Sequence, residues 1–243
     1  MNSLDLSDRQ NPLGEIRELL KRVDKLKEGH ASERLSTIGA ILEESANVEQ
    51  RRLVRAREGA PQHNLFRLLG IERSEVGLHS RLLADLLDPY GSHGQGALFL
   101  QRFFQMLGRH DREIGDLAGA IPDTPPRWEW AIGRERERID ISIRNRRLGI
   151  LIFIENKIDA GEREKQLEDY RKLLEGHTSY RCHRLIYLSP KSKGPPMTGS
   201  PHLHLTYEDD IRAWLLSCLS EVRASRIRET LAQYLDIISD LSR

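Results

Sequence analysis

Two acidic residues and a lysine fall where strand geometry would bring them together. Asp140 lies on the polar side of the alternating stretch 139–143, and Glu155 follows the strongly apolar stretch 150–154. Lys157 comes two residues later, and residues i and i+2 of a strand point to the same face. A tight turn joins the two stretches, so we expect adjacent strands with converging carboxylates. A carboxylate pair beside a lysine suits Mg²⁺ binding and hydrolysis; the simpler alternative is a surface salt bridge.

The elements that must position these residues follow from the periodicity. Apolar residues recur at helical spacing up to about residue 120, and a proline-rich boundary at 122–126 precedes a change to strand alternation. The predicted order is helices, then β-β-β-α-β, then helices. The first strands are joined by links short enough for hairpins, whereas the fourth follows a helix and needs a parallel partner. The fold class is therefore α/β, with a mixed central sheet flanked by helices.

The N-terminal segment, residues 1–60, forms a separate helical part in this interpretation. One apolar stripe runs from Leu13 to Leu26 and a second from Leu35 to Ala46, with Glu and Arg on the other faces. This segment is either a hairpin packed on the core or an arm that pairs two subunits in a homodimer. Residues 61–243 form the second domain, with its core strands in 127–190.

Composition excludes several classes of protein. Charged residues make up 31% and hydrophobic residues 38%, which fits a globular chain, and the net charge of +1 excludes a polycation. No apolar run approaches the roughly 20 residues of a spanning helix, and the first residues do not resemble a signal peptide. The short apolar runs lead us to expect no membrane partner. Cys182 and Cys218 are the only cysteines, so we expect a reducing cytoplasm. The sequence lacks zinc spacing and phosphate-binding glycine motifs.

The residues around the acidic pair resemble a known family. Asp140, the run Glu155-Asn156-Lys157 and the pattern IDISI…ILIFIENKI are similar to the PD-(D/E)XK nuclease superfamily. The similarity extends over about residues 62–190 and includes LLADLLDP and FLQRFF, as in an uncharacterised bacterial branch with a helical segment before the motifs. It implies a restriction-endonuclease-like αβββαβ core with an N-terminal helical extension. The proline often found before the first acid is absent here, where Arg138-Ile139 stands.

The resemblance also implies roles for these residues. Asp140 and Glu155 would bind a divalent metal, Mg²⁺ or Mn²⁺, with the Asn156 backbone carbonyl as a further ligand. Lys157 would orient or activate the attacking water, or offset phosphate charge. Glu75 matches an acid that many members place on the first core helix, pointing at the metal; the alternative is a carboxylate stabilised by the helix dipole.

Further residues are candidates for nucleic-acid contact, each with a structural alternative. His79 lies one helical turn after Glu75 and would contact phosphate, hold Glu75 or sit in the core. Gln166 and Tyr170 match a Gln-x-x-x-Tyr feature of exonuclease-like members, and Tyr170 could equally be a core aromatic. Arg144 and Arg146 lie in a predicted hairpin turn, which is either solvated or in contact with phosphates.

The sequence therefore predicts a Mg²⁺-dependent nuclease that hydrolyses DNA phosphodiester bonds, and the resemblance fits a role in defence against foreign DNA. Nucleic acid, with DNA favoured, is the expected partner. Two alternatives stay open. One is a nucleic-acid-binding or regulatory protein that keeps the fold without turnover, which the intact Asp140, Glu155 and Lys157 argue against. The other is an RNase.

Overall fold

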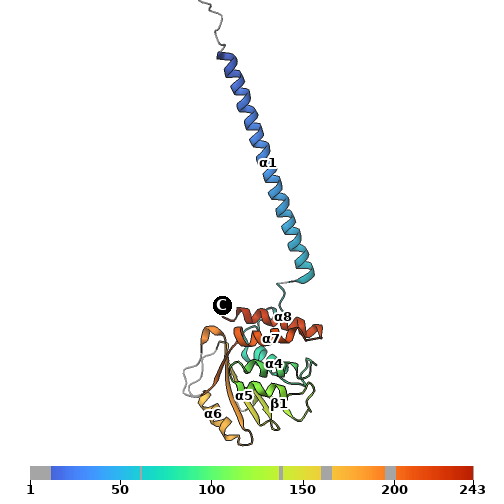
Figure 1. Cartoon of the computed structure of the whole chain (residues 1–243), viewed down its shortest axis with the longest axis vertical. Coiled ribbons are helices and arrows are strands. Elements are labelled where there is room, and N and C mark those ends of the chain that lie inside the picture. Colours follow the sequence, from blue (N-terminus) through green and yellow to red (C-terminus); the bar gives the residue numbers. More distant parts are fainter. Residues whose placement is uncertain (1–11, 61, 137–138, 160–165, 195–200, 243) are drawn as a thin grey trace, which may run out of the picture. The chain divides into compact units, whose positions relative to one another are not determined.

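The computed structural model describes most of the chain (Figure 1). The described residues are 12–60, 62–136, 139–159, 166–194 and 201–242. The chain divides into two compact units, Met1–His63 and Asn64–Arg243. No helix in the described ranges combines the length and the apolarity that crossing a membrane requires.

The described residues of the first unit form one helix, α1, which runs from Pro12 to Gly59 over 48 residues. Because α1 is continuous, both predicted apolar stripes lie on a single element and not on the two arms of a hairpin. All of its side chains from Leu13 onward are exposed. Packing of an apolar face normally supplies most of the stability of a helix in a protein, and α1 has no such packing within its unit.

The second unit is built on a five-stranded sheet in the order β1-β2-β3-β4-β5. The strands are β1 (Trp130–Arg136), β2 (Ile139–Asn145), β3 (Ile150–Asn156), β4 (Cys182–Ser189) and β5 (Leu203–Thr206). The pairs β1/β2 and β2/β3 are antiparallel, whereas β3/β4 and β4/β5 are parallel. The prediction of hairpins followed by a parallel crossover is confirmed.

Helices cover both faces of this sheet (Figure 1). On one face, Ile152 and Ile154 of β3 belong to a large core. The helices that supply side chains to this core include α3 (Arg81–Leu87), α4 (Leu98–Leu107), α7 (Arg212–Leu219) and α8 (Ser225–Asp240). On the other face, Phe153 packs in a smaller cluster with Leu167 and Leu174 of α6 (Gln166–Gly176). The mixed sheet with flanking helices confirms the predicted fold class.

Two helices predicted as regular begin instead with a wider π-helical turn. Residues Glu75–Ser80 (η1) lead into α3, and residues Tyr207–Ile211 (η4) lead into α7. The Ser74 hydroxyl caps η1 by accepting a hydrogen bond from the Gly77 amide at 3.0 Å. π-Helical turns frequently occur at functional sites, and both of these carry side chains that reach the end of β3.

The remaining elements are short. They are α2 (Leu65–Leu68), α5 (Arg112–Asp116), η2 (Leu117–Ala120) and η3 (Lys191–Lys193). Strand alternation begins at Trp130, the first residue of β1, because Trp128 precedes the strand and is 79% exposed. Residues 160–165, which precede α6, and Arg138 lie outside the described ranges.

Candidate active site

The turn between β2 and β3 sets the register that aligns the two predicted acids. The Leu148 amide donates to Asn145 Oδ1 at 2.8 Å, and Gly149 adopts a φ of +67° that favours glycine. In the resulting ladder Ile141 pairs with Ile154. One step further, Asp140 of β2 is level with Glu155 of β3, and opposite residues of antiparallel strands share a face.

Asp140 and Lys157 both interact with the end of β3. Asp140 Oδ2 accepts a hydrogen bond from the Asn156 amide at 2.8 Å. Lys157 Nζ lies 2.6 Å from Glu155 Oε1, and the two side chains are only 11% and 1% exposed. The Lys157 amide donates to the Leu188 carbonyl at 2.9 Å, which extends the ladder to β4. The structure thus brings Asp140, Glu155 and Lys157 together.

The environment of Glu155 disfavours the charged form of its carboxyl group beside the carboxylate of Asp140. Burial and then the charge of Asp140 raise the pKa of Glu155 to about 7, while Lys157 and the Tyr170 hydroxyl oppose this shift. Its Oε2 atom is buried and has no hydrogen-bond partner within the described ranges. A cation placed between the two carboxylates would stabilise the charged form of Glu155.

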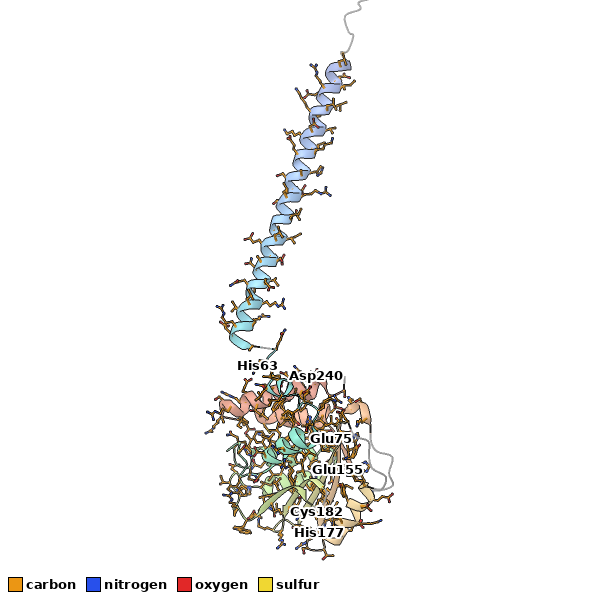
Figure 2. The ribbon with its side chains drawn as sticks, turned by 180° about the vertical axis from the view of Figure 1, so that it is seen from behind. His63, Glu75, Glu155, His177, Cys182 and Asp240 are labelled. Carbon is orange, nitrogen blue, oxygen red and sulfur yellow. The ribbon has the colours of Figure 1, made fainter. Side chains whose placement is uncertain are left out.

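Glu75 reaches the same strand end from η1 (Figure 2). Its Oε1 accepts hydrogen bonds from the amides of Ile158 and Asp159, at 2.7 and 3.0 Å. These amides directly follow Lys157, so this carboxylate holds the backbone that leaves the β3 end.

Asn156 faces away from the carboxylates and anchors the strand end in the large core. Its side-chain amide donates to Ser80 Oγ at 3.0 Å and to the Glu75 carbonyl at 3.3 Å. Its Oδ1 accepts a hydrogen bond from the Tyr207 hydroxyl at 2.6 Å. Sequence reasoning missed Ser80 and Tyr207, because nothing in their spacing links them to residue 156.

The comparison with known proteins agrees with this geometry. A family model described as the PD-(D/E)XK nuclease superfamily matches residues 63–236. The chain belongs to this superfamily. No curated protein and no solved structure matched the chain. The matched region includes η1, the whole sheet and most of α8, which confirms the resemblance seen in the sequence.

PD-(D/E)XK nucleases generally use divalent metal ions. Within the described residues, no group of three or more His, Cys, Asp or Glu side chains is arranged to hold one. Asp140 and Glu155 nevertheless fit such an ion, because the unpartnered Glu155 Oε2 is a hard oxygen ligand in a buried position. Mg²⁺ is often bound by one or two carboxylates with water or phosphate oxygens completing its octahedron.

Gln166 and Tyr170 of this nuclease domain contact the candidate ligand itself. Gln166 Nε2 donates to Glu155 Oε1 at 2.8 Å and to the Tyr170 hydroxyl at 2.7 Å. Tyr170 is buried, and burial raises its pKa to about 12. The two residues predicted as nucleic-acid contacts therefore lie one turn apart on α6 and support Glu155 from the sheet face that carries the site.

His79 lies in the core of the nuclease domain. Its ring is fully buried, with Nδ1 2.8 Å from the Tyr234 hydroxyl and Nε2 2.9 Å from the Glu72 carbonyl. Because a carbonyl only accepts, Nε2 carries the proton and Nδ1 accepts from Tyr234. Burial lowers the pKa of His79 to about 4. His79 thus takes the core position that the sequence left open, and its ring is not available to phosphate in this structure.

The two predicted arginines lie further along β2 and in its turn. Arg144 is partly buried and, with Arg134 and Ser142, lines a hollow on β1 and β2. Positions 140, 142 and 144 are every second residue of β2 and therefore point to the same face of the sheet, so Arg144 lies on the face that carries Asp140. Arg146 is exposed in the turn, where its carbonyl accepts from the Gly149 amide at 3.2 Å.

Proposed function

We propose that this chain is a divalent-metal-dependent nuclease that hydrolyses DNA phosphodiester bonds. The observation that carries the proposal is the pairing of Asp140 with Glu155 on one face of the sheet, with Lys157 Nζ 2.6 Å from the Glu155 carboxylate. Membership of the nuclease superfamily supports the reaction class. The choice of DNA over RNA is part of the proposal, and the RNA substrates in the assay below test it.

In this proposal each of the site residues has a distinct role in hydrolysis. Asp140 and Glu155 hold the metal, and the metal supplies Lewis-acid activation of water and charge neutralisation at the phosphate. Lys157 places a positive charge beside Glu155, where it orients the attacking water or a phosphate oxygen. Gln166 and Tyr170 keep Glu155 in position, and Glu75 keeps the segment after Lys157 in place. Hydrolysis forms a bond from the water oxygen to phosphorus and breaks the bond to the leaving oxygen, which departs with a proton.

Cleavage assays on the full chain test the proposal. Plasmid, linear DNA, single-stranded DNA and RNA are each incubated with Mg²⁺, Mn²⁺ or EDTA. We expect DNA cleavage that requires metal and that Asp140→Asn and Lys157→Ala reduce to the EDTA background. The Asn side chain keeps its shape and its acceptor for the Asn156 amide but lacks the charge that a hard cation prefers. Asp169→Asn, an exposed site on α6, is the matched control and should cleave normally.

Binding measurements separate the alternatives. Asp140→Asn should bind DNA about as well as the wild type while its calorimetric affinity for Mg²⁺ or Mn²⁺ falls, whereas Lys157→Ala should keep its metal affinity. Cleavage of RNA alone would identify an RNase, and tight binding without turnover in either metal would identify a non-catalytic binding protein. Cleavage by Asp140→Asn at the wild-type rate would exclude this site as the catalytic one.

A further inference from the structure

The exposed apolar side chains of α1 point to a partner surface. Large aliphatic residues along the helix are between 43% and 75% exposed. They are Leu13, Ile16, Leu19, Leu20, Val23, Leu26, Leu35, Ile38, Ile41, Leu42 and Val48. An exposed apolar surface of this extent is unusual for a monomeric soluble protein and marks an interaction site.

The apolar residues of α1 also form a seam along the helix. They recur at steps of three and four residues, which places them along one side of a helix with 3.6 residues per turn. The seam is interrupted once, in the segment 27–34, where Lys27, Ala31 and Arg34 continue the steps of three and four residues.

We propose that α1 pairs with α1 of a second copy of this chain in an antiparallel arrangement centred between His30 and Ala31. In this register the apolar residues on one side of the interruption meet those on the other. Leu13 lies opposite Val48, Leu19 opposite Leu42, Leu20 opposite Ile41, Val23 opposite Ile38, and Leu26 opposite Leu35. The seam is therefore self-complementary, which is the requirement for a two-fold interface between identical chains.

The net charges of the two halves of α1 favour the antiparallel orientation, whereas Lys27 lies opposite Arg34 at its centre. Residues 12–28 carry five basic and four acidic side chains, and residues 33–49 carry one basic and four acidic side chains, giving net charges of +1 and −3. The antiparallel pair places these two halves against each other. A parallel pair would instead place the −3 halves together and set Arg51, Arg52, Arg55 and Arg57 against their own copies, and flanking charges select the orientation of paired helices.

Light scattering on the full chain after size exclusion tests the pairing. The wild type should have twice the mass of the 28.0 kDa chain. Val23→Lys or Ile38→Glu alone should raise the dimer dissociation constant by more than about 100-fold, because an unpaired charge is placed in an apolar seam. Ser36→Glu lies on the opposite side of α1 and is the matched control; it should stay dimeric, with unchanged helicity by circular dichroism.

The double variant Val23→Lys with Ile38→Glu tests the register. In the antiparallel pair each new lysine faces a new glutamate of the other copy, so dimerisation should recover. In a parallel pair like charges would meet, and the double variant should remain monomeric. A monomeric wild type at tens of micromolar, a larger assembly, a dimeric single variant or a monomeric double variant would each overturn the proposal. None of these outcomes depends on whether the chain cleaves DNA.

Discussion

Glu155 is the residue on which the contacts of the site converge. Lys157 Nζ and Gln166 Nε2 both reach its Oε1, and Asp140 lies level with it on the neighbouring strand. The remaining oxygen, Oε2, is buried without a partner in the described part of the chain. One carboxylate is therefore oriented by two donors and keeps its second oxygen for a ligand, which is the preorganisation that metal-assisted hydrolysis requires.

His79 gives a pH-dependent contribution to stability. The pKa is about 4 in the folded chain against the ordinary value of 6.5, because burial disfavours the charged ring. A lowered pKa means that the unfolded state binds more protons between these values, so stability is complete above about pH 6.5 and falls as the pH drops toward 4. The loss amounts to about 3 kcal/mol for a shift of this size.

The test is the unfolding free energy of metal-free wild type and His79→Gln from urea titrations between pH 8 and pH 4. Glutamine should cost about 1–3 kcal/mol at high pH, since it replaces two buried hydrogen bonds imperfectly. The wild-type advantage should shrink as the pH falls, and the difference between the two proteins cancels contributions from other groups such as Glu155. His63→Gln, at an exposed position, should follow the wild type throughout; parallel curves for wild type and His79→Gln would contradict the prediction.

The sequence allowed part of this site to be predicted. Asp140, Glu155 and Lys157 could be placed on one face because strand periodicity is local. Gln166 and Tyr170 were expected from the resemblance to contact nucleic acid, and the structure places Gln166 against both Glu155 and Tyr170. Ser80 and Tyr207 could not be found, since each contacts Asn156 across a long stretch of chain. The buried position of His79 depends on its contact with Tyr234, 155 residues away. No local sequence pattern could therefore decide whether His79 lies at the surface or in the core.

At the scale of elements, the two π-helical turns fix the end of β3. η1 supplies Glu75 to the amides after Lys157, and η4 supplies Tyr207 to Asn156 Oδ1. Sequence periodicity predicted helices in both regions but not the wider turns, because one extra residue in a turn barely changes an apolar pattern. The sequence also did not decide whether the N-terminal segment forms a helical hairpin or an arm that pairs two subunits. Two apolar stripes are expected in either case.

Tyr207→Phe tests the anchoring of β3. Loss of the hydroxyl leaves the buried Asn156 Oδ1 without that donor, and an unsatisfied buried acceptor costs about 1–3 kcal/mol. We expect this loss in urea titrations, together with a several-fold lower cleavage rate and unchanged DNA affinity, because the strand end carries the catalytic groups. Tyr180→Phe, beside the smaller core cluster, is the control and should change neither the rate nor the affinity. A Tyr207→Phe protein with wild-type stability would show that Asn156 is anchored without it.

At the scale of the whole molecule, the net charge of +1 is too small to attract DNA by itself, so the proposed nuclease would need a local basic contact. Arg146, exposed in the β2–β3 turn, is our candidate for a phosphate contact. Each phosphate contact contributes about 0.9 to the slope of log affinity against log salt concentration. Arg146→Ala should therefore reduce that slope by about 1 on any DNA sequence, as measured by fluorescence anisotropy in Ca²⁺.

Arg112→Ala supplies the comparison for this slope. Arg112 is 92% exposed on α5, which packs into the large core on the sheet face opposite the site. Its removal should leave the slope unchanged. Equal slopes for wild type and Arg146→Ala would remove the β2–β3 turn from the DNA-binding surface.

The length of α1 sets the distance between the two outer helix ends of the proposed dimer. At 1.5 Å per residue, an antiparallel pair centred between residues 30 and 31 separates the two Gly59 ends by about 85 Å. The nuclease domains are attached at these ends, and duplex DNA covers the same distance in about 25 base pairs at 3.4 Å per pair. This spacing keeps the two attachment points, Gly59 of each copy, apart along the paired helices, and removing one turn of α1 from one copy would bring the points closer by about 5.4 Å.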